Sequence, residues 1–259
     1  MGKIRADKLL VELGLAPSRE RAQALILAGR VLVGEQKVEK PGTTVDATAP
    51  VRVIGDELRY VSRGGVKLEA ALRHWKIDVT GKTCLDVGAS TGGFTDCLLQ
   101  HGAARVVAID TGYGQMDALL RNDARVRLLE RTNARYLEPG HIAEPVQLLV
   151  MDVAFISATL VLPAVVRSIR GSGWQSASGT GSLEAVVLVK PQFEAGREHV
   201  GKGGIVRDAA AQQAAVERVR LAMQSLAFAV TGAIDSPILG AEGNREFLLY
   251  GRIEGGEPH

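Results

Sequence analysis

The segment Cys84-Leu85-Asp86-Val87-Gly88-Ala89-Ser90-Thr91-Gly92-Gly93-Phe94 decides the fold of this chain. An apolar stretch runs into a glycine-rich turn, and a helical pattern begins directly after the turn. In α/β proteins this order of strand, turn and helix brings backbone N–H groups against a nucleotide-like ligand. We therefore predict that the turn forms one side of a ligand site.

The sequence on both sides of this turn predicts a mostly parallel, doubly wound sheet of seven strands. Continuous apolar strand patterns alternate with amphipathic helix patterns, which is typical of a parallel sheet covered by helices on both faces. The predicted strands are 83–87, 105–109, 126–129, 147–151, 185–189, 226–233 and 247–251. The predicted helices are 66–75, 93–101, 157–170 and 207–224. We expect a Rossmann-like α/β domain over residues 64–259.

Residues 1–60 predict a separate, small α+β domain, with a linker at about 55–63. Helical spacing at 7–14 and a second helix after Ser18 precede short strand patterns at 31–33 and 51–54. Residues 1–76 carry fourteen Lys and Arg against nine Asp and Glu, a net +5, whereas the rest of the chain is at −3. This asymmetry favours a polyanion-binding module joined to a different domain. Ordinary scatter of surface charge is the alternative.

The cysteines, the histidines and the most apolar window of the sequence argue against a secreted protein, a metal site and a membrane span. Cys84 and Cys97 lie in apolar patterns and no secretory leader pattern precedes them, so we expect reduced thiols and a cytoplasmic location. The five histidines share no metal-ligand spacing, so no metal is predicted. The most apolar window, 148–166, contains Asp152 and Pro163, which favours a buried strand and helix over a membrane span.

The glycine turn fits neither of two common phosphate-binding patterns. A dinucleotide fingerprint requires a second glycine where this chain has Ser90, and a P-loop requires lysine where it has Phe94. A second glycine-rich segment, 196–203, matches the P-loop except at Gly203, which has no hydroxyl to hold Mg²⁺. We interpret that segment as a loop near a site.

The pattern Asp86-x-Gly88-x-x-x-Gly92-Gly93-Phe94 resembles motif I of S-adenosylmethionine-dependent methyltransferases. This ligand has no phosphates, and glycines let the backbone approach it closely. Asp110 ends the next strand, 22 residues after Gly88, and is suited to accept from ribose hydroxyls, with a turn aspartate as the alternative. Asn133 is a candidate adenine contact or a plain turn residue. The resemblance implies cofactor contacts at Asp86, Gly88, Ser90, Gly92, Gly93, Phe94, Asp110, Asn133 and Asp152.

The N-terminal pattern of Arg5-x-Asp7, Ser18-Arg19, Gly29-x-Val31-x-Val33 and Lys40-Pro41 resembles an S4-type RNA-binding domain. The resemblance implies contacts with RNA phosphates, whose contribution to affinity depends on salt. The residues that we expect to make them are Arg5, Arg19, Arg21, Arg30 and Lys40, joined by Arg63 before the second domain. Solvated arginines without a ligand are the alternative.

Four further polar residues stand at ends of elements around the predicted cleft: Lys67, Asp152, Lys190 and Glu246. Open α/β sheets build their sites at the carboxyl ends of parallel strands. In their sequence contexts the four resemble the Lys-Asp-Lys-Glu tetrad of the FtsJ-like RNA ribose 2′-O-methyltransferases. Together with the S4-like front, the chain resembles the hemolysin A (TlyA) family over nearly its whole length. Salt bridges at sheet ends without a catalytic role are the alternative.

The resemblance implies transfer of a methyl group from S-adenosylmethionine to the 2′-hydroxyl of a cytidine in ribosomal RNA, with ribosomal RNA or ribosomal subunits as partners. We expect Lys190 to stabilise the developing alkoxide and accept its proton, Lys67 and Glu246 to position the hydroxyl, and Asp152 to hold Lys190. Two other functions stay open, a non-catalytic RNA-binding ribosome assembly factor and a membrane-active hemolysin. For the latter the sequence offers neither a span nor a clear basic amphipathic helix.

Overall fold

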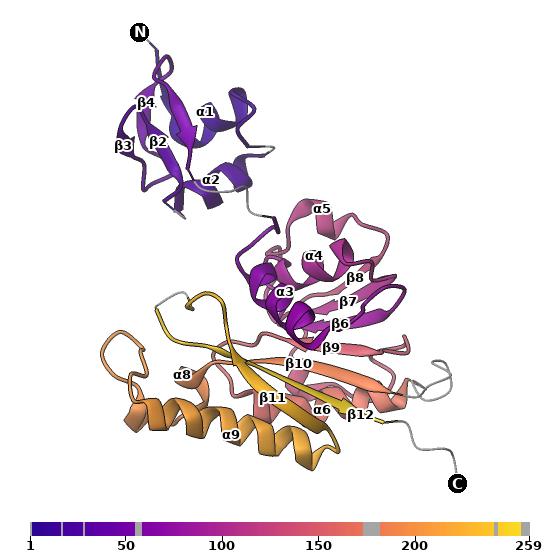
Figure 1. The fold of residues 1–259 in the computed structure, drawn as a ribbon. Coiled ribbons are helices and arrows are strands. Elements are labelled where there is room, and N and C mark those ends of the chain that lie inside the picture. Colours follow the sequence, from indigo (N-terminus) through magenta and orange to yellow (C-terminus); the bar gives the residue numbers. More distant parts are fainter. Residues whose placement is uncertain are drawn as a thin grey trace. The chain divides into compact units, whose positions relative to one another are not determined.

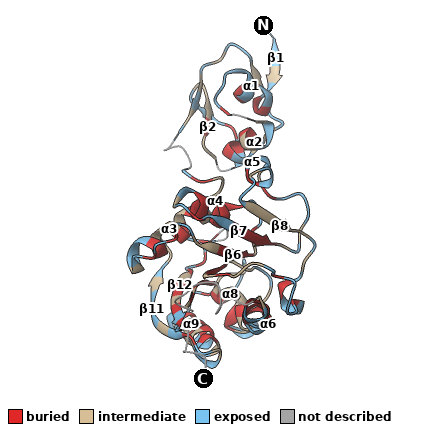
Figure 2. Cartoon of the chain, turned by 90° about the vertical axis from the view of Figure 1, so that its right-hand side faces the viewer, coloured by how far each residue is buried: buried red, intermediate tan, exposed pale blue. Residues whose placement is uncertain are grey.

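The computed structural model describes residues 2–16, 18–27, 29–54, 59–172, 182–240 and 243–254. The chain divides into two compact units, Met1–Glu57 and Leu58–His259. The first unit has one cluster of buried apolar residues and the second has two, visible in Figure 2 as red segments on the inner sides of helices and strands. Each unit therefore has its own hydrophobic core.

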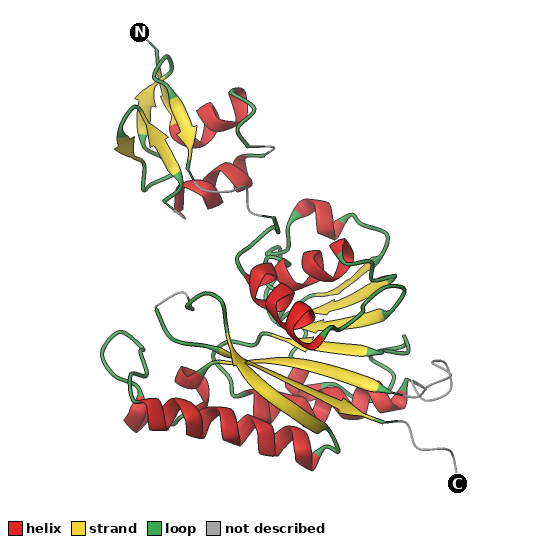
Figure 3. Ribbon diagram, in the orientation of Figure 1, coloured by secondary structure: helices red, strands yellow, loops and turns green. Residues whose placement is uncertain are grey.

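The first unit is a small α+β domain, as the sequence predicts (Figure 3). Its elements are β1 (Lys3–Arg5), α1 (Ala6–Glu12), α2 (Arg19–Leu27), β2 (Val31–Val33), β3 (Gln36–Lys37), β4 (Thr44–Asp46) and β5 (Val51–Val53). β1 pairs with β4, and β2 lies between β3 and β5, all antiparallel. Leu10 of α1 and Ile26 of α2 are fully buried in the core, so the two helices pack through the apolar faces that their spacing predicts.

The second unit contains the predicted seven-stranded sheet, in the order β11-β12-β10-β9-β6-β7-β8. Its strands are β6 (Thr83–Val87), β7 (Arg105–Ile109), β8 (Val126–Leu129), β9 (Leu148–Met151), β10 (Leu183–Val189), β11 (Ala229–Asp235) and β12 (Phe247–Ile253). β12 runs antiparallel to both of its neighbours, and the other pairs are parallel. The carboxyl ends of β6, β7, β9 and β10 therefore share one edge, which is where a ligand site is expected.

Helices cover both faces of this sheet (Figure 1). They are α3 (Gly64–Trp75), α4 (Gly93–Gln100), α5 (Ala118–Arg121), α6 (Ala158–Gly171), α8 (Pro191–Glu194) and α9 (Ala209–Ser225), with short 3-10 helices η1 (Ala134–Tyr136) and η2 (Arg197–His199). α3 and α4 pack on the face that includes Cys84, whereas α6 and α9 pack on the face that includes Leu85. This alternation along β6 explains why the strand is apolar on both sides.

Two boundaries differ from the sequence-based expectation. The strand predicted at 226–233 begins only at Ala229, because Leu226 caps α9 and Ala227 turns the chain with a φ of 72°. In the predicted linker, residues 55–58 lie outside the described part of the chain. Tyr60 is 1% exposed within the second unit, where its ring packs against Gly65 and stacks on His101. The second domain therefore begins before residue 64.

Candidate functional site

The glycine turn after β6 needs glycine because other parts of the backbone approach it closely. Gly88 has a φ of 87°, and a Cβ atom there would lie 2.4 Å from the carbonyl oxygen of Asp152. Gly92 has a φ of 96°, and a Cβ atom there would lie 2.3 Å from Leu120 Cδ1. Both conformations are strained for side chains larger than hydrogen. The turn is therefore shaped by its neighbours as well as by a ligand.

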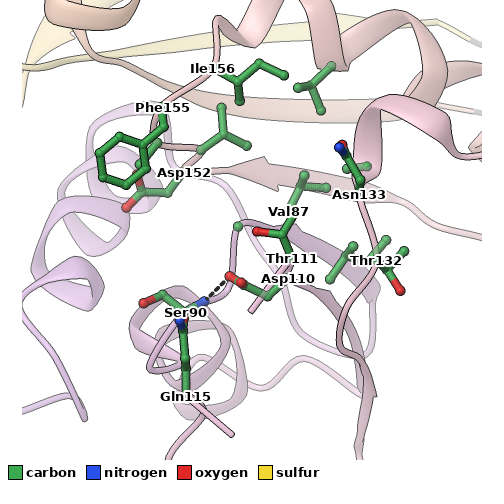
Figure 4. A pocket seen from close by; sticks show the side chains of 16 residues that line it. Val87, Ser90, Asp110, Thr111, Gln115, Thr132, Asn133, Asp152, Phe155 and Ile156 are labelled. Carbon is green, nitrogen blue, oxygen red and sulfur yellow. Dashed lines mark hydrogen bonds between the residues drawn. The ribbon is translucent and has the colours of Figure 1, made fainter. Parts of the chain in front are cut away.

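A cavity of about 330 Å³ opens at the carboxyl ends of β6, β7 and β9. Figure 4 shows Ser90 and Asp110 on one side of it, Asn133 on another, and Asp152 and Phe155 on a third. The glycine turn, the residue after β7 and the loop after β9 thus meet at one pocket. The sequence predicted this meeting from strand ends alone.

Asp110 is held in one orientation by two backbone donors. Its Oδ2 accepts from Ser90 N at 2.8 Å and its Oδ1 accepts from Gly112 N at 2.7 Å (Figure 4). A carboxylate has about four acceptor sites, so hydroxyl groups of a ligand can still bind to it. Asn133 lines the same pocket and accepts from Arg135 N at 3.1 Å, which makes it the N-cap of η1. Both residues therefore line the larger cavity, and their contacts with a cofactor stay a prediction.

Asp86 and Gly92 are not part of the pocket wall, contrary to the sequence-based expectation. Asp86 is fully buried on the α4 side of β6, where its Oδ2 accepts from Thr95 Oγ1 at 2.7 Å. Burial raises the pKa of Asp86 to about 7, with nearby Asp152 adding to the shift, while the bond from Thr95 opposes it. Gly92 is the N-cap of α4 and faces Leu120. Asp86 and Gly92 therefore support the conformation of the turn from beneath and do not line the cavity.

A second, smaller cavity of about 140 Å³ adjoins the first. Gly88, Ser90 and Asp152 line both cavities, and Lys67 of α3 lines only the smaller one. Gly93 and Phe94, the other turn residues predicted to bind cofactor, also line the smaller cavity. The two cavities thus share one wall, with Asp110 lining the larger and Lys67 the smaller, and together we call them the cleft.

The four predicted catalytic residues form two ion pairs beside this cleft. Lys67 Nζ lies 2.5 Å from Glu246 Oε2, and Lys190 Nζ lies 2.5 Å from Asp152 Oδ1. Their side chains are 3% to 20% exposed. Since Lys67 and Asp152 line the same cavity, all four belong to one group with balanced charge. Desolvated ion pairs of this kind are a weak source of stability, which favours a functional reason for them.

The sequence analysis did not assign two residues beside this group, Glu194 and Phe155. Glu194 braces the loops that carry the group. Glu194 of α8 is 3% exposed and accepts from Ser157 Oγ at 2.5 Å and from Ala158 N at 2.7 Å. Burial raises the pKa of Glu194, and the hydroxyl of Ser157 opposes that shift. These bonds tie the segment after Lys190 to the segment after Asp152. Only the structure reveals this, because the partners are 36 and 37 residues apart.

Phe155 is the second missed residue. Its side chain is 93% exposed although it is aromatic, its φ is 65°, and it lines the larger cavity beside Asp152. The ring contacts Phe193 with a centroid distance of 5.5 Å. Positive φ at a bulky residue is strained and tends to persist at functional sites. An aromatic residue three positions after the strand-end aspartate was the signal available in the sequence.

The predicted RNA contacts of the first unit do not all gather in one place. Arg5 and Arg19 both pair with fully buried Asp7, at 2.9 and 3.0 Å, and Gln23 donates to the same carboxylate. The bonds from Arg5 contribute most to holding the pKa of Asp7 well below its usual range. Both guanidinium side chains are still 44% to 46% exposed, so they can meet a ligand while anchored.

Of the other predicted RNA contacts, Lys40 belongs to a turn beside Arg5, since Asp7 N donates to Pro41 O at 3.2 Å and a Cβ atom on Gly42 would lie 3.4 Å from Arg5 Nη1. Arg30 Nε donates to the carbonyl of Ile54 after β5, and Arg21 lies in the first turn of α2. Lys40 is exposed at the turn before β4. Arg63 belongs to the second unit, where its guanidinium donates to the carbonyl of Leu239 at 2.9 Å. Arg5 and Arg19 therefore meet at Asp7, whereas Arg63 belongs to the other unit.

Within the described residues, no helix combines the length and the apolar character that crossing a membrane requires. The fourteen-residue helix α6, which includes the second half of the most apolar window, is instead packed into the core of the second unit.

Comparison with known families identifies both units. The family of FtsJ-like methyltransferases matches residues 60–253, and the S4 domain family matches residues 4–51. These matches confirm the two resemblances inferred from the motifs. The first match covers most of the chain and includes all four residues of the two ion pairs.

Individual relatives span nearly the whole chain. The 16S/23S rRNA (cytidine-2′-O)-methyltransferase TlyA of Mycobacterium tuberculosis is 46% identical, over 97% of this chain and 91% of its own. Hemolysin A of Brachyspira hyodysenteriae is 39% identical, over 95% of this chain and 99% of its own. A solved structure from Streptococcus thermophilus, described as a candidate hemolysin, is 40% identical with a TM-score of 0.73, and covers 100% of this chain and 90% of its own.

Proposed function

Since the chain belongs to the FtsJ-like methyltransferase family and S-adenosylmethionine is its methyl donor, we propose that it methylates the ribose 2′-hydroxyl of a cytidine in ribosomal RNA. The observation that carries this proposal is the presence of two largely buried ion pairs at the end of the cleft. One joins Lys67 to Glu246, and the other joins Lys190 to Asp152. The name of the mycobacterial relative supports the acceptor and the nucleotide. A ribosomal RNA substrate would place the reaction in the cytoplasm.

The larger cavity fits the methyl donor. Asp110, fixed by Ser90 N and Gly112 N, would accept from the ribose hydroxyls, and Asn133 offers amide groups to the adenine. Gly88 lets the backbone come close, and the carboxylate of Asp152 lies in the part of the wall shared with the smaller cavity. When bound, this cofactor supplies an activated methyl group on a sulfonium.

The chain's own residues then act on the acceptor. A ribose hydroxyl is a weak nucleophile, so a cation beside its oxygen is needed to stabilise the developing alkoxide. Lys190, as the neutral amine, would accept the hydroxyl proton as the methyl group is transferred; the ammonium group so formed would stabilise the charge on the oxygen, and Asp152 would hold it in place. Lys67 and Glu246 position the hydroxyl from the other side of the cleft. Alignment can contribute about 7–11 kcal/mol and proton transfer about 10²–10⁴-fold, so alignment dominates.

The S4 domain is proposed to bind the RNA. Arg5 and Arg19 are anchored on Asp7 with their guanidinium groups half exposed, and Lys40 is exposed at the turn before β4. Such contacts to phosphates carry most of the affinity and no sequence information. We propose that they deliver ribosomal RNA to the cleft, with Arg21, Arg30 and Arg63 as further contacts.

Mapping 2′-O-methyl groups in ribosomal RNA tests the proposal. Ribosomal subunits from cells without the protein would be incubated with S-adenosylmethionine and the purified full-length chain. We expect a new methyl group on at least one cytidine ribose. Subunits that bind the protein tightly and gain no methyl group would support an assembly factor instead. Leakage of liposomes caused by the pure protein, without methylation, would support the hemolysin alternative.

A further inference from the structure

A basic loop, residues 196–207, takes no part in the cleft described above. It joins α8 to α9 and contains the segment that nearly matches a P-loop. In Figure 1 the loop lies at the same end of the strands as the connection from β11 to β12, which leads to Glu246. Arg197, Lys202 and Arg207 are all exposed in it. The loop therefore places three cations at the edge of the sheet that carries the site.

Two carboxylates, Glu198 in the loop and Asp208 directly after it, have other partners and form no ion pair with these three cations. In the described part of the chain, no carboxylate lies within ion-pair distance of Arg197, Lys202 or Arg207. Some arginines elsewhere on the same unit are paired, Arg105 and Arg127 with Glu144, Arg121 with Glu130, and Arg125 with Asp123, whereas the exposed Arg73 and Arg167 have no ion pair with a described residue. Exposed cations without an internal partner keep their charge for an external anion.

Buried contacts fix the position of the loop relative to the catalytic group. Asn244 is 1% exposed; its Oδ1 accepts from Val206 N at 3.0 Å and its Nδ2 donates to Gly204 O at 2.8 Å. Asn244 stands two residues before Glu246. The other end of the loop starts six residues after Lys190, beyond the short helix α8. The loop is therefore anchored on both sides to segments that carry a proposed catalytic residue.

The geometry of the loop excludes a nucleoside triphosphate. The short helix α8 and not a strand leads into Gly196, and Gly203 stands where a P-loop needs a hydroxyl. Gly196, Gly203 and Gly204 have φ values of 91°, 78° and 73°, so they let the loop turn sharply, and its three cations are exposed. Spread-out cations without a convergent pocket suit an extended polyanion.

We propose that residues 196–207 bind the phosphate backbone of the acceptor RNA beside the methylated nucleotide, through Arg197, Lys202 and Arg207. This inference rests on the proposed function, since it assumes that the acceptor is RNA. It gives the methyltransferase domain its own RNA contact, independent of the S4 domain. Because backbone contacts position a nucleic acid without reading it, the loop sets register and affinity, and the cleft performs the chemistry.

The test compares the full-length protein with the triple variant Arg197→Gln, Lys202→Gln, Arg207→Gln. The matched control is Arg73→Gln, Lys76→Asn, Arg167→Gln, which removes two arginines and one lysine from exposed positions outside the loop. Asparagine is chosen at Lys76 because that residue has a φ of 52°. Binding to ribosomal subunits is measured between about 50 and 200 mM salt, together with methyl transfer and S-adenosylmethionine affinity.

For the loop variant we expect the slope of log affinity against log salt to fall by about 2 to 3, since about 0.7–0.9 is lost for each phosphate contact removed. KM for RNA should rise roughly tenfold, with kcat at saturating RNA and cofactor affinity retained. The control should keep the wild-type slope. An unchanged slope and KM in the loop variant, while the wild type methylates RNA, would overturn this inference alone. Absence of methyl transfer by the wild type would instead overturn the proposed function.

Discussion

The two ends of the cleft are built in different ways. At the cofactor end, Asp110 is oriented by backbone N–H groups of Ser90 and Gly112, which are at most 20 residues away in the chain. At the acceptor end, Lys67 finds its partner Glu246 179 residues away, and Lys190 and Asp152 come from different strand ends. One end depends on local backbone geometry and the other on the whole sheet being assembled.

This difference predicts that substitutions at the two ends affect different steps. Removing a group that only orients the cofactor should weaken cofactor binding and leave the maximal rate, whereas removing a group that acts on the hydroxyl should lower the rate and leave cofactor binding. Asp152 lines both cavities and pairs with Lys190, so it is the one tetrad residue for which both effects are expected.

The largest effect is expected at Lys190. Lys190→Ala should lower kcat by about 10²–10⁴-fold, the range for a lost acid–base group, while S-adenosylmethionine affinity stays within about twofold. Single-turnover methyl transfer and calorimetric titration of the cofactor would measure the two quantities. Lys82→Ala is the matched control, because Lys82 pairs with Glu184 at the opposite end of the same sheet. Near-normal turnover of Lys190→Ala would remove this residue from the mechanism.

Asp110 should show the reverse behaviour. Asp110→Ala removes the carboxylate proposed to accept from the ribose, so the Kd for S-adenosylmethionine should rise about 10- to 100-fold, the cost of losing hydrogen bonds to a charged group. The rate at saturating cofactor should be largely kept. Asp78→Ala, which changes an exposed turn aspartate, controls for loss of charge. If Asp110→Ala lowered kcat without changing the Kd, the division of the cleft into two ends would be wrong.

The sequence predicts the cofactor end better than the acceptor end for the same structural reason. The turn is one contiguous segment, so the sequence places Gly88 and Ser90 after β6, and Asp110 follows the next strand; their contacts with the cofactor stay a prediction from the resemblance. Asp86 and Gly92 belong to the same segment and were misplaced, because their side-chain directions depend on Thr95 and Leu120 packing beneath the turn. Periodicity does not reveal which neighbours lie under a turn.

The acceptor end could be assembled only through a resemblance. Strand-end positions place Asp152 and Lys190 at one edge of the sheet, but nothing in the spacing pairs Lys67 with Glu246. The Glu194 braces and the Asn244 anchor arise from long-range packing and therefore had no local signal, whereas the only signal for Phe155 was its position three residues after Asp152. The S4-like pattern did not predict that Asp7 binds both Arg5 and Arg19.

Phe155 tests whether the acceptor end extends beyond the tetrad. Its exposed ring beside Asp152 offers a stacking surface for the base of the target nucleotide. Since stacking of a base on an aromatic ring contributes about 1–3 kcal/mol, Phe155→Ala should lower kcat/KM for RNA roughly tenfold. Phe155→Tyr should keep most of the activity, because it keeps the ring. Equal activity of the Ala and Tyr variants would leave the exposed ring without a role in transfer.

The smallest effect on transfer is expected at Asp86, which lies beneath both ends. Asp86→Asn keeps an acceptor for Thr95 Oγ1, so cofactor affinity and turnover near pH 7 should change little. The variant should instead change how stability depends on pH. Burial raises the pKa of Asp86 from 3.8 to about 7, so between these values the native state holds a proton that the unfolded chain has lost.

This contribution of Asp86 to stability is therefore fully present below about pH 4 and is lost as pH rises to about 7. Urea unfolding from pH 4 to pH 8 should show Asp86→Asn gaining stability relative to the wild type across that window. Asp123→Asn is the opposite control, because Arg125 lowers the pKa of Asp123 from 3.8 to about 2. That variant should lose stability relative to the wild type as pH rises from about 2 to about 4, so its unfolding is also measured in that range, and from pH 4 to pH 8 its difference from the wild type should stay constant. Parallel pH curves for Asp86→Asn and wild type would mean that Asp86 is solvated, and the turn would then rest on its glycines alone.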